Sequence, residues 1–184
     1  MIWIILTIVA ALAVFLVVIY NSLVSARQLV DNGWSDIDVQ LKRRSDLIPR
    51  IVDTVKGYAS HERNLFEDIV KKRNLALQAG SAPGARGAAE GALGQPVSRL
   101  FAVAEDYPDL KSNKNFLDLQ NELSDTENKI EMARRFYNGA VRQMNIKVQS
   151  FPINLIAGAF GFGEREYFDI DPSDAANPSI EFDS

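Results

Sequence analysis

Hydrophobic positions repeat with a helical period through most of the second half of the chain. Successive apolar or small residues stand three or four positions apart: Phe116, Leu119, Leu123, Thr126, Ile130, Ala133, Tyr137, Ala140 and Met144. Such a seam is typical of a helix that packs lengthwise on other helices, as in a coiled coil. No proline lies between Pro108 and Pro152, so we predict one long helix that ends near Ser150 and needs long partners to cover it.

A similar pattern predicts another long helix from Asn21 to Ala59. Its apolar residues share one face: Trp34, Ile37, Leu41, Ile48, Val52, Val55 and Ala59. The helix either continues directly from the residues before it or has a joint at Asp31-Asn-Gly33, since glycine weakens a helix by about 1 kcal/mol. Pro49 is expected to bend it, because proline cannot donate the hydrogen bond to the Ser45 carbonyl.

Two shorter helices are expected between the long ones. The first runs roughly from Ser60, a good N-cap, to Ala79, and is expected to bury Leu65, Ile69 and Leu77. Residues 80–94 are mostly Gly and Ala and predict a mobile connection. A third helix should start at Pro96 and end near Pro108. The pattern therefore predicts an all-α fold, with an antiparallel up-down-up-down four-helix bundle over residues 21–150 whose first and fourth helices are long.

The residues before the bundle form an apolar run. From Ile2 to Tyr20 only Thr7 is polar, and these nineteen residues at ~1.5 Å each reach about 28 Å, close to the ~30 Å hydrocarbon core of a bilayer. Trp3 and Tyr20 stand at its two ends, where aromatic side chains favour the headgroup level. We therefore predict a transmembrane anchor over residues 1–20 that contacts membrane lipid through Ile2, Trp3, Ile19 and Tyr20.

A cleaved signal peptide is the competing interpretation of this run, because Val24-Ser-Ala26 faintly resembles a cleavage site. The missing basic residues at the amino end and the length of the run favour an uncleaved, single-pass anchor in the cell (inner) membrane. No Lys or Arg precedes the anchor and Arg27 follows it, so the positive-inside bias places the bundle in the cytoplasm. Only Arg27 lies close, which leaves the other side open.

The region after the long helices contains two further segments. Residues 151–163 are almost wholly apolar but too short to span a bilayer. They form either a short helix that caps the bundle's base or a contact with lipid or a neighbouring subunit. The candidate contact residues are Phe151, Ile153, Leu155, Ile156, Phe160 and Phe162.

The acidic tail covers residues 164–184. It has seven acidic residues and one Arg, a net charge of −6, and subtracting this from the chain's −4 leaves the remainder at +2. Tyr167, Phe168 and Ile170 are candidate partner-binding residues that could add as a strand to another protein, in an otherwise flexible recognition tail.

Four stretches and Trp34 resemble the LemA family. The stretches are Leu119 to Asn138 (LQNELSDTENKIEMARRFYN), Phe151 to Ala157 (FPINLIA), Gln40 to Pro49 and Gly57 to Glu62. The resemblance covers nearly the whole chain after the apolar leader. It implies a membrane-anchored antiparallel helical bundle, and it implies no catalytic activity.

The residues themselves offer little chemistry. There is no cysteine, so neither a disulfide nor a thiolate metal site can form, and the single histidine, His61, cannot build a metal site alone. The carboxylates are spread over solvated faces, and no serine or lysine has the setting of a nucleophile. We therefore expect no enzyme, no cofactor and no metal, and the net negative charge argues against nucleic-acid binding.

Two functions remain from the sequence. The first is a non-catalytic, membrane-anchored scaffold that organises membrane or partner proteins as a homo-oligomer in which anchors and apolar segments pack side by side. The second is an adaptor or substrate-presenting subunit for another membrane protein, such as a membrane protease, that uses the acidic tail. Co-purified partners that survive deletion of the tail would count against the second.

Overall fold

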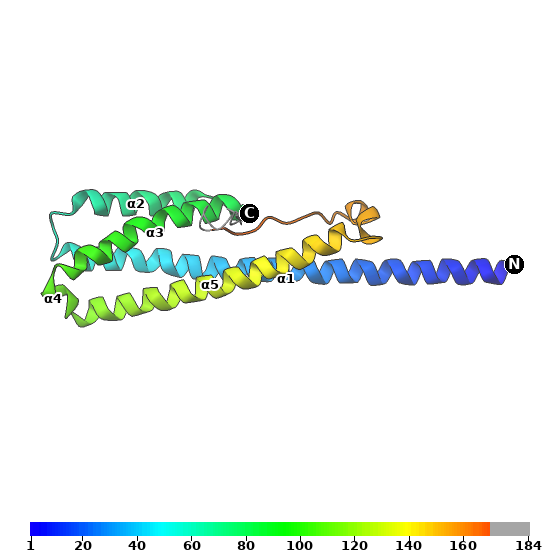
Figure 1. Cartoon of the computed structure of the whole chain (residues 1–184), viewed down its shortest axis with the longest axis horizontal. Helices are drawn as coiled ribbons and strands as arrows, with labels where there is room; N and C mark the ends of the chain where they lie inside the picture. The colour runs from blue at the N-terminus through cyan, green and yellow to red at the C-terminus, as the bar shows by residue number, and fades with distance from the viewer. Residues whose placement is uncertain (170–184) are drawn as a thin grey trace, which may run out of the picture. The chain divides into compact units, whose positions relative to one another are not determined.

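The computed structural model describes residues 1–169, and all of its secondary structure is helical. The long helices are α1 (Ile2–Lys56), α2 (Arg63–Gln78), α3 (Pro83–Glu105) and α5 (Lys114–Gln149). Between α3 and α5 lies the single turn α4 (Pro108–Lys111), and two 3-10 turns, η1 (Ile153–Leu155) and η2 (Gly158–Phe160), follow α5 (Figure 1).

The chain divides into two compact units. The first contains residues 1–37 and 133–166, and the second contains residues 38–132 with the residues from Tyr167 on. The helices α1 and α5 each contribute to both units. The predicted division into an anchor over residues 1–20 and a bundle over residues 21–150 stays a prediction.

In the first unit, α1 runs without a break through the expected joint at Asp31-Asn-Gly33. A Cβ atom on Gly33 would lie 3.1 Å from both the Phe136 ring and the Tyr137 Cα, so the missing side chain lets α1 and α5 approach closely. Trp34 and Tyr137 pack beside this contact with ring centroids 5.5 Å apart. The glycine is therefore a packing residue, and of the two alternatives for this region the continuous helix is the one that forms.

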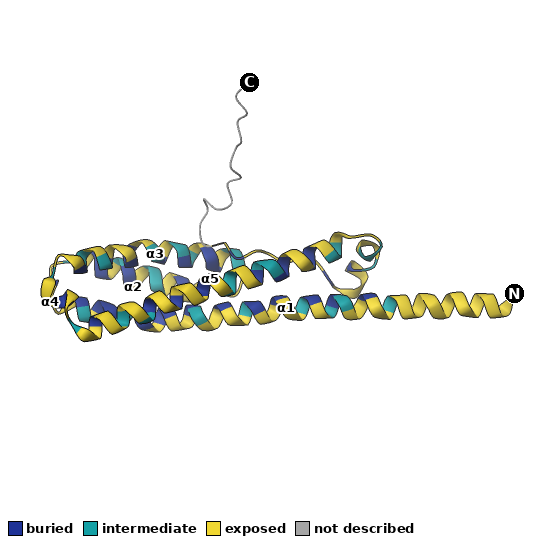
Figure 2. Cartoon of the chain, turned by 60° about the horizontal axis from the view of Figure 1, so that its bottom comes forward, coloured by how far each residue is buried: buried dark blue, intermediate teal, exposed yellow. Residues whose placement is uncertain are grey.

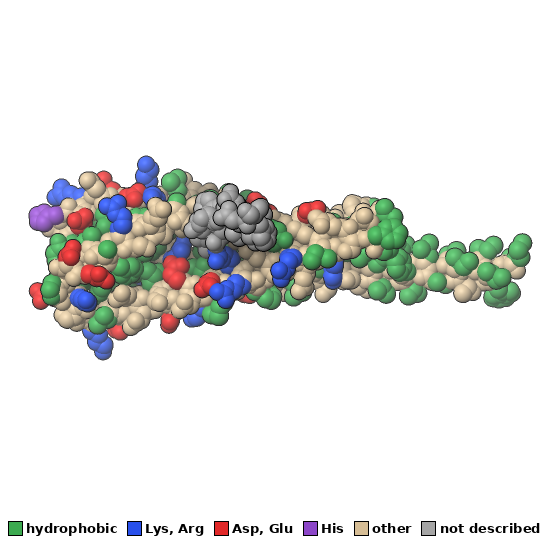
Figure 3. Space-filling model, viewed as in Figure 1, with side chains coloured by type: hydrophobic (Ala, Val, Ile, Leu, Met, Phe, Trp, Pro, Cys, Tyr) green, Lys and Arg blue, Asp and Glu red, His purple; other side chains and the backbone are tan. Residues whose placement is uncertain are grey.

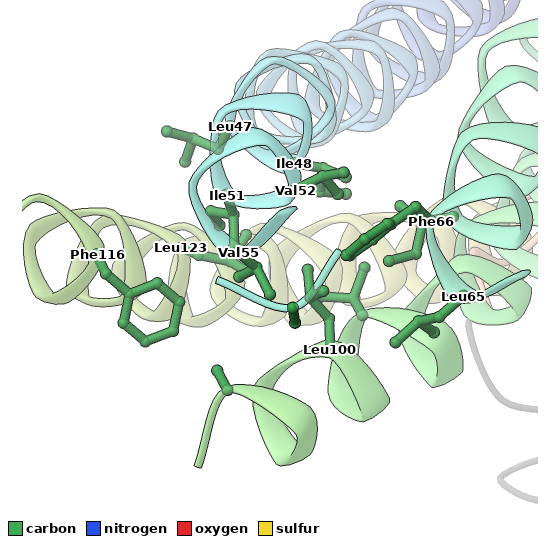
Figure 4. Packing of buried hydrophobic residues seen from close by; sticks show 14 of the residues in the cluster. Leu47, Ile48, Ile51, Val52, Val55, Leu65, Phe66, Leu100, Phe116 and Leu123 are labelled. Carbon is green, nitrogen blue, oxygen red and sulfur yellow. The ribbon is translucent and has the colours of Figure 1, made fainter. Parts of the chain in front are cut away.

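The second unit has a hydrophobic core to which α1, α2, α3, α4 and α5 all contribute (Figure 4). From α1, Ile48, Ile51 and Val55 face this core, and α5 supplies Phe116 and Leu123. Arg43 of α1 bonds Glu122 of α5, and Asn113 just before α5 bonds Tyr58 just after α1, so the two segments run antiparallel.

The boundaries of α2 correct the predicted ones. The helix begins at Arg63 with Glu62 at the N-cap position, and Ser60 lies in the preceding turn. Leu65 and Ile69 are buried as expected. Leu77 is exposed, and Ala76 takes its place in the core, because the helix presents the neighbouring position to α3.

The prediction of a mobile connection over residues 80–94 is wrong for most of that range, since α3 starts at Pro83. Proline at the first helical position costs no hydrogen bond, and the alanines that follow are strong helix formers that offset the glycines. Packing on α2 adds to this, and α3 buries Gly87, Glu90 and Leu93. The predicted third helix from Pro96 is only the second half of α3.

Candidate functional site

The amino-terminal part of α1 is uncovered by the rest of the described chain. Every residue from Met1 to Phe15 is exposed, and these side chains are hydrophobic and uncharged except for the polar Thr7 (Figures 2 and 3). Among residues 1–169, α1 is the one helix long and apolar enough to cross a membrane. The predicted anchor residues Ile2, Trp3 and Tyr20 are exposed, whereas Ile19 is buried.

Burial on α1 begins where the apolar run ends, because residues 151–162 pack there. We call residues 151–162 the apolar turn. The ring of Tyr20 packs in T-shaped geometry on the rings of Phe160 and Phe162, with centroids 5.5 and 5.7 Å away. The Arg27 guanidinium lies 4.9 Å from the centroid of the Phe162 ring, a cation–π contact.

The carboxyl end of α5 holds the apolar turn at this level. The Lys147 ammonium donates to the Ser22 hydroxyl at 2.9 Å and to the Ser22 carbonyl at 3.2 Å. Two 3-10 turns then reverse the chain, and Gly161 with φ of 72° adopts the left-handed conformation that ends η2. Of the two alternatives for this segment, the short helix is replaced by two single 3-10 turns, and the contact with lipid or a neighbouring subunit stays a prediction.

The six predicted contact residues of the apolar turn divide into three groups by exposure. Phe151 is 80% exposed, Leu155 71% and Phe160 40%, so these side chains form an apolar surface that the chain leaves open. Ile153 and Ile156 are half-buried. Phe162 is buried at 3% under Tyr20 and Arg27, so its ring packs within the unit and is closed to an outside contact.

The chain then returns along the first unit as an extended strap, residues 163–166. Asn145 of α5 holds it like a strand partner: its amide donates to the Arg165 carbonyl at 2.9 Å and its oxygen accepts from the Arg165 N–H at 2.7 Å. The Arg165 guanidinium pairs with Asp31 of α1 at 2.7 Å. The Tyr137 hydroxyl donates to the Glu166 carbonyl at 2.8 Å.

The strap changes the acidity of Tyr137. Burial raises the pKa of the Tyr137 phenol above its usual value, and the nearby carboxylates of Glu166 and Asp31 act in the same direction. The positive charge of Arg165 opposes them. The phenol therefore stays protonated and able to donate to the strap well into the alkaline range.

Beyond the strap, the predicted tail residues do not behave alike. Phe168 is fully buried in the second unit, so it is not free to pair with a partner, while Tyr167 is 40% exposed. Ile170 lies outside the described residues. Over residues 163–169 the chain has no assigned strand.

A buried ion cluster in the second unit was missed by the sequence analysis. The Arg44 guanidinium, 5% exposed, pairs with Glu90, donates to the Glu90 carbonyl at 3.1 Å, and reaches Glu127 at 3.2 Å. Arg86 pairs with the other oxygen of Glu90 at 3.0 Å. The available signal was the gap left between Leu41 and Ile48 on the apolar face of α1, which Arg44 occupies.

The ion cluster is better explained as a structural link between helices than as a reactive site. Its charges neutralise one another, as buried ion pairs require. Within residues 1–169, no three His, Cys, Asp or Glu side chains are grouped so that they could hold a metal ion. The site with the clearest means of interaction is therefore the exposed apolar end of the first unit.

Fold and site together define an all-helical protein with a candidate membrane span. A sequence profile of the LemA family matches residues 33–182, and the chain belongs to that family.

Curated relatives extend the match. The chain is similar to magnetosome protein MamQ 2 of Paramagnetospirillum magneticum, with 26% identity over 92% of this chain and 71% of the relative. Magnetosome protein MamQ of Magnetospirillum gryphiswaldense is 25% identical over 84% of this chain and 66% of the relative. Protein LemA of Metamycoplasma hominis is 27% identical over 85% of this chain and 75% of the relative.

Proposed function

We propose that this protein is a non-catalytic, membrane-anchored helical scaffold that assembles with copies of itself in the plane of the membrane. The observation that carries the proposal is the apolar end of the first unit, where the uncovered start of α1 stands next to the exposed apolar turn. A lone span holds its neighbours weakly. Phe151 and Leu155 add apolar surface directly beside it, at a level where lipid headgroups or another protomer can cover them.

The anchor itself suits close helix packing. Ala10, Ala11 and Ala13 are small, and small residues let membrane helices approach one another. The remainder of the chain, with its antiparallel pairing of α1 with α5, is best explained as an up-down-up-down four-helix bundle carried by this anchor. The charge bias favours the cytoplasmic side of the cell membrane for the bundle.

The test is the mass of the detergent-solubilised, full-length protein. Changing Leu155, Ile156 and Phe160 to Ser should reduce an oligomer to smaller species, measured by light scattering after size exclusion. A matched control changes Leu75 and Leu77, two exposed leucines of α2, to Ser and should leave the mass unchanged. A wild-type monomer with intact helicity would refute self-assembly.

A further inference from the structure

A groove lies between α3 and α5 in the second unit. It has a volume of about 590 Å³, which is in the size range of ligand and peptide sites. Small residues of α3 (Gly91, Gly94 and Ser98) open it, and a Cβ atom on Gly94 would meet nothing within 4 Å. Apolar side chains line its wall: Val97, Phe101 and Leu123.

The described end of the chain lies on the same face of α3. The backbone of Asp169 packs so closely on Gly87 that a methyl group there would overlap the Asp169 carbonyl oxygen. Gly87, Gly91 and Gly94 are spaced four and three positions apart, so they share one helix face. The chain therefore reaches residue 169 one helical turn from the groove.

The sequence that follows has a segment suited to the groove. In Pro178-Ser-Ile-Glu-Phe182, an extended backbone puts Ile180 and Phe182 on one side and Glu181 on the other. The LemA profile match extends to residue 182, so it includes this segment. From Asp169 to Ile180 the eleven residues can reach ~36 Å, whereas Gly87 to Gly94 spans only ~10 Å of helix.

We propose that Ile180 and Phe182 of this chain's own tail fill the groove between α3 and α5. Their side chains cover the apolar wall, and the carboxylates of Glu181 and Asp183 stay in solvent, away from Glu90 and Glu127 at the groove's charged end.

The absence of native cysteine allows a direct test in the full-length protein in mild detergent. Ser184→Cys, which in an extended backbone lies on the same side as Ile180 and Phe182, is combined with Ser98→Cys inside the groove, or with Gln95→Cys, an exposed control on the same helix that does not line it. Docking should make oxidative cross-linking at residue 98 about tenfold faster than at residue 95, because it raises the local thiol concentration. The product should migrate as a cross-linked monomer.

Two further variants separate docking from chance collision. Gly94→Leu fills the groove where space is open, and Ile180→Ser with Phe182→Ser removes the apolar pair; each should bring the rate at residue 98 down to that at residue 95. Ala175→Ser with Ala176→Ser is the tail control and should leave the difference intact. Equal rates at both positions in the wild-type background overturn the proposal. A cross-linked dimer overturns it too, and assigns the groove to the tail of a second copy.

Discussion

Arg44 is a charged residue at a core position of the second unit. It lies on α1 between the buried Leu41 and Ile48, and its guanidinium has lost nearly all of its water. Desolvation of that size is tolerated only where carboxylates and carbonyls replace the water, which Glu90 and Glu127 do here. The pairing links α1 to both α3 and α5.

Replacing Arg44 by Met should therefore lower the free energy of unfolding by about 3 kcal/mol, because it leaves the buried Glu90 with Arg86 as its remaining partner. The measurement is urea unfolding in mild detergent, followed by circular dichroism. The adjacent Arg43→Met removes an ion pair that is about 40% exposed on both sides, and should cost less than about 1 kcal/mol. Equal losses for the two variants would contradict the structural role given to Arg44.

Tyr137 makes the stability of the first unit fall with rising pH in the alkaline range. Its pKa is raised on folding, so its contribution is fully present below the unfolded value of about 10 and is lost as the pH rises through the folded pKa. Tyr137→Phe should cost about 1 kcal/mol at pH 8, where the bond to the Glu166 carbonyl is lost. The stability gap between wild type and variant should then shrink above pH 10, as measured by urea midpoints. A gap that stays constant with pH would show that the phenol does not titrate with unfolding.

At the scale of elements, sequence periodicity predicted those helices whose buried positions are hydrophobic and regularly spaced. The seams of α1 and α5 carry Leu, Ile and Val at regular spacing, and both helices form where they were expected. For the first half of α3 no such seam exists, because its buried positions are Arg86, Gly87 and Glu90. Those residues are buried by specific partners on other elements, and a single helix's sequence does not contain that information.

Gly87 of α3 packs against the backbone of Asp169, and this contact can be tested by substitution. Gly87→Ala should favour the isolated helix by up to about 1 kcal/mol, yet it displaces Asp169 and with it the buried Phe168. We expect faster cleavage by chymotrypsin after Phe168, resolved by mass spectrometry of the fragments. Gly94→Ala makes the same change of residue in open space and should leave that cleavage rate unchanged. If Gly87→Ala is cleaved no faster, the contact with Asp169 does not hold the chain.

At the scale of the whole molecule, the helix α1 begins with a candidate membrane span and continues without a break into the core of the second unit. The apolar turn returns to α1 next to Tyr20, where the apolar run ends. The exposed residues 1–15 carry no charged side chain, and charged side chains begin at Arg27 and are spread over the rest of the described residues. This separation is what a protein needs to meet lipid with one part and water with the other.

The charge bias predicts the side of the membrane that the bundle occupies. Because Arg27 lies on the carboxyl side of the candidate span, a cysteine at the exposed Ser112 should be inaccessible to a membrane-impermeant maleimide in cells whose inner membrane is sealed, and labelled after lysis. Adding three lysines before Ile2 and changing Arg27 to Gln reverses the bias and should make a large share of the protein reactive from outside. Arg63→Gln, far from the anchor in sequence, is the control and should have no effect. Labelling of the Ser112→Cys protein in sealed cells, without the added lysines, would place the bundle on the outer side.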